Sequence, residues 1–545
     1  MSTRQARQVN PWAAMAALCI GFFMIMLDTT IVSVAVPSML THLKASLNQV
    51  VWVTSVYLLT YAVPLLLTGR LGDRIGRKKM FMAGLFVFTA SSLWCGLSGN
   101  VEMLIIARGV QGLGAAMMTP QTMAFITNLF PPNKRGAPMG MWGGVAGLAT
   151  IAGPLLGGVL VDNFGWQWIF MVNVPIGVVA LVLTAFLVPG AQTFTKRKFD
   201  VLGTVLSSLG LLALVFGLQN GQQYHWGKAF GPINVGEIIG LGVLLLIAFV
   251  YSQSRNRQEP LVPLSLFRHR NFAAANGANL MIGFALTGMF LPLVIYFQSV
   301  RGLSPLESGL VTAPMSLLSG IVAPIAGRLS DRISGKYVSM TGFSALAVGL
   351  LIIVAQARWD TSPAALIPAL LVCGFGVGCV FSPLANLATS DVPLPSIGAA
   401  SGIFNTSRQV GGVLGSAAIG VLLQARLTTS MHSAAVTQAA ALPPAYRGQF
   451  IAGLSNTAGS SAEFGGSSGA PALPPGVPAT VAQRIGQLAT AAFQHGFTDA
   501  TRATLVLPAV VLIIGALACV PMVRRARPVA DVPGTPSEEV ATERV

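Results

Sequence analysis

The chain has 545 residues, of which 53% are hydrophobic and 9% are charged, whereas an average soluble domain has roughly 25% charged residues. So few charges exclude a soluble globular protein of this length, and lipid is expected to cover much of the surface. The net charge of +16 falls in short clusters between long apolar runs, which is typical of membrane topology and not of a nucleic-acid-binding groove.

Apolar runs long enough to cross a bilayer, about 20 residues each, follow one another along the chain. They predict about fourteen transmembrane helices, near 12–37, 49–68, 80–98, 103–128, 136–161, 167–188, 201–219, 232–252, 272–297, 305–330, 337–356, 364–390, 397–424 and 503–523. The first run is too long for the apolar core of a cleavable signal peptide.

The Lys and Arg residues divide unequally between the two sides of these helices. With the N-terminus in the cytoplasm, 23 of the 33 lie on the cytoplasmic side, eight lie outside, and Arg108 and Arg408 fall within segments. Because basic residues are enriched in short cytoplasmic loops, both termini are predicted to be cytoplasmic.

Asp28 in the first segment and Arg108 in the fourth lie where a charge is costly and usually functional. We expect them to face one another. Burial penalises a charged carboxylate and a nearby guanidinium favours it, so a conformational cycle that changes either influence makes Asp28 a proton carrier. The alternative is a static pair that only orders the helices, and Arg108 in particular suits the role of a structural organiser.

Residues 69–79 form a short basic loop between the second and third segments. The loop contains Gly69, Arg70, Gly72, Asp73, Arg74, Gly76, Arg77 and Lys78. One interpretation is a topological anchor that keeps the loop in the cytoplasm. The other is a conformational latch, which Asp73 forms with a neighbouring helix in one state of a transport cycle.

The fifth segment carries small residues at three- and four-residue spacing, which lets helix backbones approach closely. The residues concerned are Gly140, Gly144, Gly153, Pro154, Gly157 and Gly158. Pro154 lacks a backbone donor and favours a kink. The pattern predicts either a hinge or tight seam about which two halves rock, or ordinary small-residue packing.

An internal repeat divides the chain. Residues 69–75, Gly-Arg-Leu-Gly-Asp-Arg-Ile, recur 258 residues later as Gly-Arg-Leu-Ser-Asp-Arg-Ile at 327–333. The same offset carries the glycines of the fifth segment onto Gly398, Gly402, Gly411 and Gly415. The expected fold is therefore an all-α polytopic membrane protein with two six-helix halves and two inserted helices, and a substrate site between the halves.

This organisation sets the predicted boundaries. The N-terminus (1–11) precedes a first half at 12–188, a linker with the inserted helices at 189–271, a second half at 272–523 and a disordered tail at 524–545. Within the second half, 425–502 is predicted to be an extracytoplasmic loop, with low-complexity coil at 455–478 and a short amphipathic helix near 481–492. That loop is either an outer gate or a tolerated insertion.

Other classes of function find no support in the sequence. There is no Gly-x-x-x-x-Gly-Lys-Ser/Thr phosphate loop and no Gly-x-Ser-x-Gly elbow, and the five His residues lack metal-ligand spacing. The five cysteines, none in a Cys-x-x-Cys pair, are expected to be apolar filler. We therefore expect no enzyme, no metal and no cofactor.

The chain resembles the drug:proton antiporters with fourteen spans in the major facilitator superfamily, the EmrB/QacA type. The resemblance rests on the run Leu-Asp-Thr-Thr-Ile-Val-Ser-Val-Ala-Val-Pro at 27–37, the loop at 69–79, the run at 108–114, the glycines at 140–158 and the runs at 166–170 and 173–177. It departs from that family's pattern at Ser33, Ala149 and Gln167, and the tenth segment has only Glu307, near its outer end, where some relatives carry a deep acid.

The resemblance implies proton coupling through Asp28 and export, driven by the proton gradient, of small hydrophobic and often cationic compounds. It also implies residence in the plasma (inner) membrane of a bacterium, with protons, membrane lipid and a small-molecule substrate as partners. Two rivals stay open. One is a dedicated exporter of a metabolite or lipid, and the other is a membrane sensor that keeps the fold but does not transport.

Overall fold

The computed structural model describes residues 10–45, 47–131, 134–190, 200–221, 224, 226–256, 260–393, 396–460 and 479–523. Its first part contains the helices α1 (Pro11–His42), α2 (Leu47–Ala62), α3 (Leu65–Ile75), α4 (Arg77–Gly96), α5 (Val101–Leu129), α6 (Gly136–Phe164), α7 (Trp168–Met171) and α8 (Asn173–Leu187). Next come α9 (Val201–Asn220), the short antiparallel strands β1 (Lys228–Phe230) and β2 (Ile233–Asn234), and α10 (Val235–Arg255).

The last part begins with the short helix η2 (Leu264–Arg268) and ends with α17 (Ala479–Ala518). Between them lie α11 (Arg270–Ile295), η3 (Tyr296–Val300), α12 (Pro305–Arg332), α13 (Gly335–Gln356), η4 (Pro363–Leu366), α14 (Ile367–Ser390), α15 (Ile397–Ala439) and α16 (Pro444–Ser460). The predicted helical class is confirmed, with one small hairpin as the exception among the described residues.

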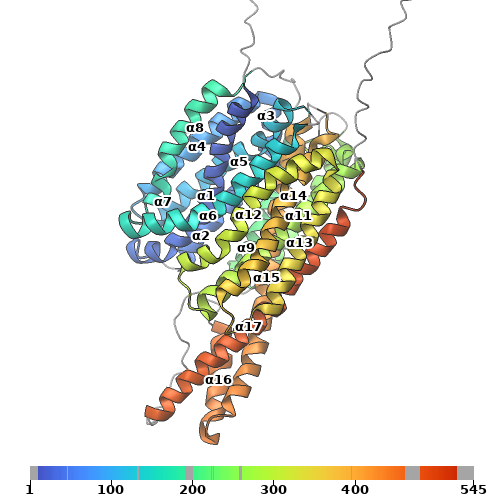
Figure 1. Ribbon diagram of the computed structural model, residues 1–545. Coiled ribbons are helices and arrows are strands. Elements are labelled where there is room, and N and C mark those ends of the chain that lie inside the picture. Colours follow the sequence, from blue (N-terminus) through green and yellow to red (C-terminus); the bar gives the residue numbers. More distant parts are fainter. Residues whose placement is uncertain are drawn as a thin grey trace, which may run out of the picture.

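The helices form two groups and a pair. Helices α1 to α8 pack on one another, and so do α11 to α17, while α9 and α10 pack together and α9 contacts α2 and α15 (Figure 1). The two groups meet where α6 packs on α12 and α14, and where α3 and α5 pack on α15. This arrangement agrees with the expected halves and inserted pair, whose residue boundaries stay predictions.

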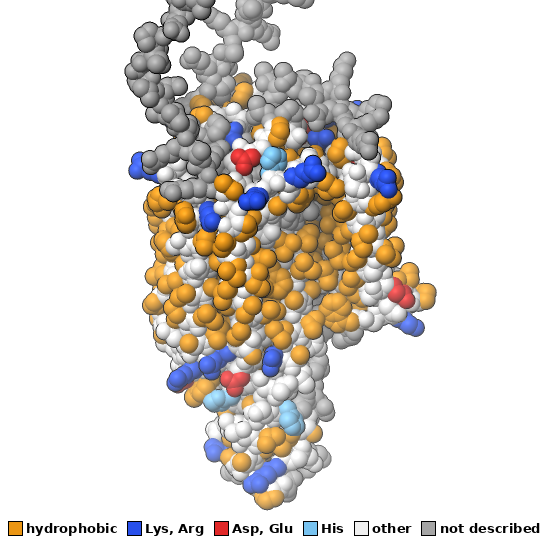
Figure 2. All heavy atoms as spheres, turned by 90° about the vertical axis from the view of Figure 1, so that its right-hand side faces the viewer, with side chains coloured by type: hydrophobic (Ala, Val, Ile, Leu, Met, Phe, Trp, Pro, Cys, Tyr) orange, Lys and Arg blue, Asp and Glu red, His pale blue; other side chains and the backbone are white. Residues whose placement is uncertain are grey.

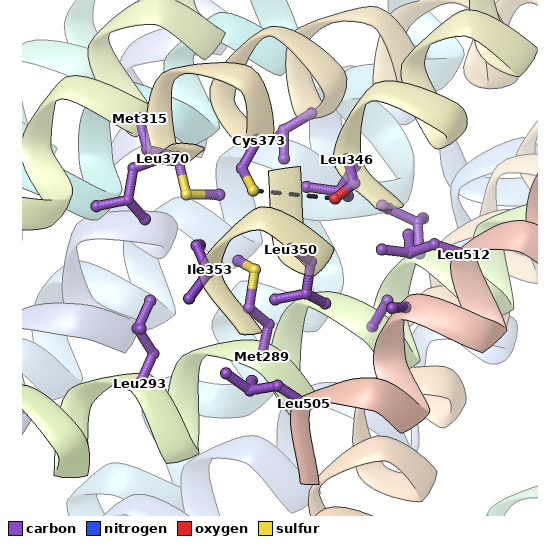
Figure 3. Close-up of a cluster of buried hydrophobic side chains, with 14 of the residues drawn as sticks. Met289, Leu293, Met315, Leu346, Leu350, Ile353, Leu370, Cys373, Leu505 and Leu512 are labelled. Atoms are coloured by element: carbon purple, nitrogen blue, oxygen red, sulfur yellow. Dashed lines mark hydrogen bonds between the residues drawn. The ribbon is translucent and has the colours of Figure 1, made fainter. Parts of the chain in front are cut away.

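The core of the second group lies where α11, α12, α13, α14 and α17 converge. Figure 3 shows Met289, Leu350, Leu370 and Leu505 in one cluster of hydrophobic side chains, and all four are buried. Cys373 lies in this cluster, with its Sγ 3.9 Å from the carbonyl of Leu346. All five cysteines are free and buried, as expected of apolar filler.

Twelve described helices are long and apolar enough to cross a membrane, and the bent pair α2 and α3 makes thirteen. The chain is therefore a multi-pass membrane protein. Each of the fourteen predicted segments coincides with a helix or a broken pair of helices, but the number fourteen itself is not confirmed. Helix α6 is not among the twelve, and its part Leu155–Phe164 counts as a shorter apolar helix.

The region 425–502 differs from the sequence prediction. Helix α15 continues to Ala439, α16 covers Pro444–Ser460, and α17 is one helix of 40 residues that joins the predicted amphipathic helix to the last predicted segment. The predicted coil is thus helical at 455–460, and its remainder, 461–478, lies outside the described residues. In Figure 1 these helices extend beyond the rest of the bundle.

We call the end of the bundle with the turn between α3 and α4 the α3 end, and the opposite end, with α16, the α16 end. Figure 2 shows a band of hydrophobic side chains between two levels that carry Lys and Arg. Many large apolar side chains on the helices are exposed, among them Leu244 and Leu517. Lipid is the environment in which such a surface is stable.

The charge distribution of the sequence predicts that the α3 end faces the cytoplasm. Arg74 is exposed at that end and Gln449 is exposed on α16. In intact cells, a membrane-impermeant maleimide should label Gln449→Cys and should reach Arg74→Cys only after permeabilisation. The wild type, whose five cysteines are all buried, is the control. Labelling of Arg74→Cys in intact cells would contradict the orientation.

Candidate functional site

Asp28 on α1 and Arg108 on α5 are in contact inside the first group of helices. Both are fully buried, and an Arg108 Nη1 lies 2.5 Å from Asp28 Oδ2. Arg108 Nε also donates to the carbonyl of Val53, and the guanidinium lies 4.0 Å from the centre of the Tyr57 ring. The two residues that the sequence singled out are therefore brought together, and α2 supplies two further partners of the cation.

Gln111 completes this cluster, and the sequence reasoning did not assign it a role. Its Nε2 donates to Asp28 Oδ1 at 3.0 Å and to Ser92 Oγ at 3.2 Å, and its Oε1 accepts from Arg108 at 2.7 Å. The available signal was its spacing, because residues three apart share a helix face. Asn173 on α8 also donates to Ser92 Oγ, so the network joins α1, α4, α5 and α8.

Arg108 has hydrogen-bonding and aromatic partners other than Asp28. An unpaired charge in a dry interior is very costly. If Asp28 takes up a proton, Arg108 still has Gln111, the Val53 carbonyl and the Tyr57 face as partners. These partners keep the Arg108 guanidinium hydrogen-bonded while Asp28 is neutral. Such an arrangement helps a carboxylate to alternate between its charged and neutral forms.

Helix α6 presents its glycines to two different neighbours. A side chain at Gly140 would collide with the backbone of α12 at Ala323 and Pro324, and one at Gly144 would press on Gly320. Farther along the helix, a side chain at Gly153 would collide with Thr30 of α1. The glycines therefore make two tight seams, one with the second group of helices and one with α1.

The seam with α1 lies next to the charged cluster. Thr30 follows Asp28 by two residues on α1. Its hydroxyl is 3.3 Å from the carbonyl of Ala149 on α6. Gly157 packs on Ile31, and Gly158 lies at the edge of the seam with α12, near Leu306. Pro154 lies within α6, which runs without a break, and its side chain is outside the described set.

Asp73 lies against the N-terminal end of α15. A side chain at Gly398 would collide with the Asp73 carboxylate and the Gly69 carbonyl, and the backbone amide of Ala399 faces the carboxylate. Arg77 holds Asp73 in place through an ion pair of 2.8 Å. The predicted contact of Asp73 with a neighbouring helix is thus present, and the partner is α15 of the second group.

Asp331, the repeat equivalent of Asp73, makes the reciprocal contact with α6. Its carboxylate accepts hydrogen bonds from the Gly136 amide at 2.9 and 3.2 Å and from Asn386 Nδ2 at 3.2 Å. Negative charge is stabilised at a helix N-terminus by the exposed amides and the helix dipole. Each group of helices therefore places one carboxylate on the first turn of a helix of the other group.

The predicted loop at 69–79 is almost entirely helical: residues 69–75 end α3, residues 77–79 begin α4, and Gly76 alone lies between the two helices. The remaining residues of this stretch have local roles. Gly72 allows Gln121 of α5 to approach, and Gly76 has φ of 103°, which glycine adopts without strain. Arg70 donates to the carbonyl of Pro260, and Lys78 donates to that of Ala185. Arg74 is exposed, as expected of a topological anchor.

The two groups are closed on one another at the α3 end. A buried apolar cluster there mixes Leu66 and Ala124 of the first group with Ile397 and Ile403 of the second. At the α16 end, the cluster around Trp166 contains buried residues from the first group only. The described contacts therefore join the groups at the α3 end and along α6 and α12.

Comparison with known proteins adds independent findings. The family model of the Major Facilitator Superfamily matches residues 18–416. The chain is 45% identical to an uncharacterized MFS-type transporter of Mycobacterium tuberculosis over 77% of this chain and 72% of that protein. It is 34% identical to the tetracenomycin C resistance and export protein of Streptomyces glaucescens over 77% of each. In fold it is similar to the proton:xylose symporter XylE (TM-score 0.53, 14% identity, 74% of this chain and 87% of that one).

The reciprocal carboxylate contacts generate a prediction about closure of the α3 end. Asp331→Asn keeps the shape but removes the charge that α6 stabilises, a loss of about 1 kcal/mol, or about fivefold in the ratio of open to closed forms. Spin labels at the exposed positions Arg74 and Arg332, in a background without the native cysteines, should show more of the longer distance by pulsed electron paramagnetic resonance. Asp73→Asn should act in the same direction.

The matched control is Glu307→Gln, which removes an acid from the other end of α12, where it caps its own helix through Ser304. It should leave the distance distribution unchanged. Identical distributions in Asp331→Asn and the wild type would show that this carboxylate does not hold the α3 end closed.

Proposed function

The chain belongs to the major facilitator superfamily, and we propose that it is a proton-coupled exporter of small lipophilic compounds. It is a membrane transporter and not an enzyme. Export is supported by the name of its Streptomyces relative, a resistance and export protein. Proton coupling is supported by the buried cluster of Asp28, Arg108 and Gln111, which is the observation that carries the proposal.

In the proposed cycle, Asp28 alternates between a protonated form and a form paired with Arg108. A proton on Asp28 occupies one of the two oxygens that accept from Arg108 and Gln111 and removes the negative charge that attracts the guanidinium, and this loosens α1 from α5. Because Thr30 and Ile31 of α1 pack on glycines of α6, the change is passed to the helix that forms the seam with α12. The coupling therefore links protonation to the relative position of the two groups.

The α3 end is proposed to face the cytoplasm, so that the structure represents a form closed on that side. The reciprocal contacts of Asp73 and Asp331 hold this form. Export requires that the substrate enter from the cytoplasm, and therefore that both contacts open in each cycle.

A dedicated exporter is the second candidate, because the Streptomyces relative is named for a single compound. The two candidates differ in breadth of substrate and not in the coupling machinery. Comparing a deletion strain with an overexpressing strain across dyes, antibiotics and the host's own metabolites separates them, since a dedicated exporter should change the tolerance or export of one compound class only.

The proposal predicts the behaviour of Asp28→Asn in proteoliposomes. The amide keeps the size and much of the hydrogen bonding of the carboxylate but cannot exchange a proton, so uphill efflux driven by an imposed pH gradient should be abolished. Arg108→Lys keeps the charge but loses the planar fork, and we expect an intermediate rate. The probes are ethidium, a neutral coumarin amide and a coumarin carboxylate, which span the charge classes.

Purified yield and thermal unfolding serve as folding controls. Asp162→Asn, at an exposed acid near the end of α6, is the matched control and should transport like the wild type. Gradient-driven efflux at wild-type rates in Asp28→Asn would show that Asp28 is structural. Absence of gradient-driven movement of every probe in the wild type would overturn the proposed function.

A further inference from the structure

Arg408 is a second cation deep within the helices, and the proposed proton coupling does not use it. It is the twelfth residue of α15, which places it about 16 Å along the helix from its start at 1.5 Å a residue. That distance is about half the thickness of a hydrocarbon core of about 30 Å. A charge at this depth is costly and marks a functional site more often than a structural one.

Aromatic groups from both groups of helices surround this cation. The Arg408 guanidinium lies near the Tyr61 hydroxyl on α2, which is 3.2 Å from Thr119 Oγ1, and 5.8 Å from the centre of the Phe381 ring on α14. Tyr61 is buried, whereas Arg408 is half-buried. Arg408 therefore lies on the seam between the groups, where transporters built from repeats bind their substrates.

The guanidinium has hydrogen-bonding capacity to spare. Its Nε is buried and has no partner among the described residues. Among the residues that the structure describes, the ion pairs involve Arg77, Arg108 and Arg502. Arg408 forms no ion pair with a carboxylate there. Asp28 does not supply one, because its two oxygens already accept from Arg108 and Gln111.

The other copy of the internal repeat does not carry this charge. The glycines of α15 match those of α6 at an offset of 258 residues, and at that offset Arg408 corresponds to Thr150. The two helices thus share their close-packing residues and differ at this position. The cation belongs to one copy only, as expected of a residue that meets an asymmetric ligand.

We propose that Arg408 binds the anionic group of the transported compound, and that the substrate class is a lipophilic aromatic molecule with a carboxylate. Arginine binds carboxylates through two parallel hydrogen bonds, and the rings of Tyr61 and Phe381 suit an aromatic body beside that group. This inference rests on the proposed function and narrows it. A cationic substrate, which the family resemblance implies, would be repelled at this position.

The test is equilibrium binding to the purified protein in lipid nanodiscs, with no gradient. The probes are 7-methoxycoumarin-3-carboxylate and 7-methoxycoumarin-3-carboxamide, which share a fluorescent ring and differ in charge. The wild type should bind the carboxylate at least about tenfold more tightly than the amide, which is the usual gain from a charge-assisted hydrogen bond. Arg408→Gln should bind both probes equally, and Arg408→Lys should keep part of the preference.

Arg426→Gln is the matched control, since it removes an exposed charge farther along the same helix, and it should behave like the wild type. The comparison of the two probes on the wild type does not depend on any variant folding. Equal binding of the probes by the wild type, tighter binding of the amide, binding of neither, or a preference that survives Arg408→Gln would each overturn the inference.

The outcomes also separate this inference from the proposed function. Binding of the carboxylate through Arg408 without gradient-driven efflux of any probe would overturn the proposed function alone. Gradient-driven efflux without a preference for the carboxylate would overturn the role of Arg408 alone.

Discussion

The ion pair of Asp28 and Arg108, removed from water between α1 and α5, is the interaction on which the rest of this structure depends. A pair of charges in such a place is stable only when its remaining hydrogen-bonding groups are satisfied. Gln111, Ser92, Val53 and Tyr57 satisfy them. Side chains from α1, α2, α4 and α5 therefore meet at this ion pair and satisfy its hydrogen-bonding groups.

The glycines of α6 connect the ion pair to the second group of helices. On one side they allow α6 to lie directly on α1, next to Asp28, and on the other they allow it to lie on α12 of the second group. Close backbone packing transmits displacement because packed interiors are stiff. Only helix α6 thus lies between the ion pair and the seam between the two groups.

Closure at the α3 end depends on charge placed at helix ends and is symmetric. Asp73 and Asp331 come from the two copies of the repeat, and each lies on the first turn of a helix in the opposite group. Such contacts are of moderate strength, which suits a contact that must break in every cycle. Arg408, in contrast, has no equivalent in the other copy and stands apart from this symmetry.

Much of the architecture follows from the sequence alone, since hydropathy and the depletion of charge directly reflect what a bilayer tolerates. The helical class, the repeat, the approach of Asp28 to Arg108 and the contact of Asp73 with a neighbouring helix were all open to sequence reasoning. The helical structure of residues 455–460 and the length of α17 could not be predicted in this way, because sequence rich in Ala, Gly and Ser outside lipid indicates secondary structure only weakly. Only the tertiary structure showed that Gln111 bridges the ion pair, that α6 packs on α1 and α12 through different glycines, and that Arg408 meets Tyr61 of α2. These contacts depend on which faces of distant helices meet, and side-chain packing between the helices decides that. Hydropathy does not predict it, because the faces of a transmembrane helix are similarly apolar.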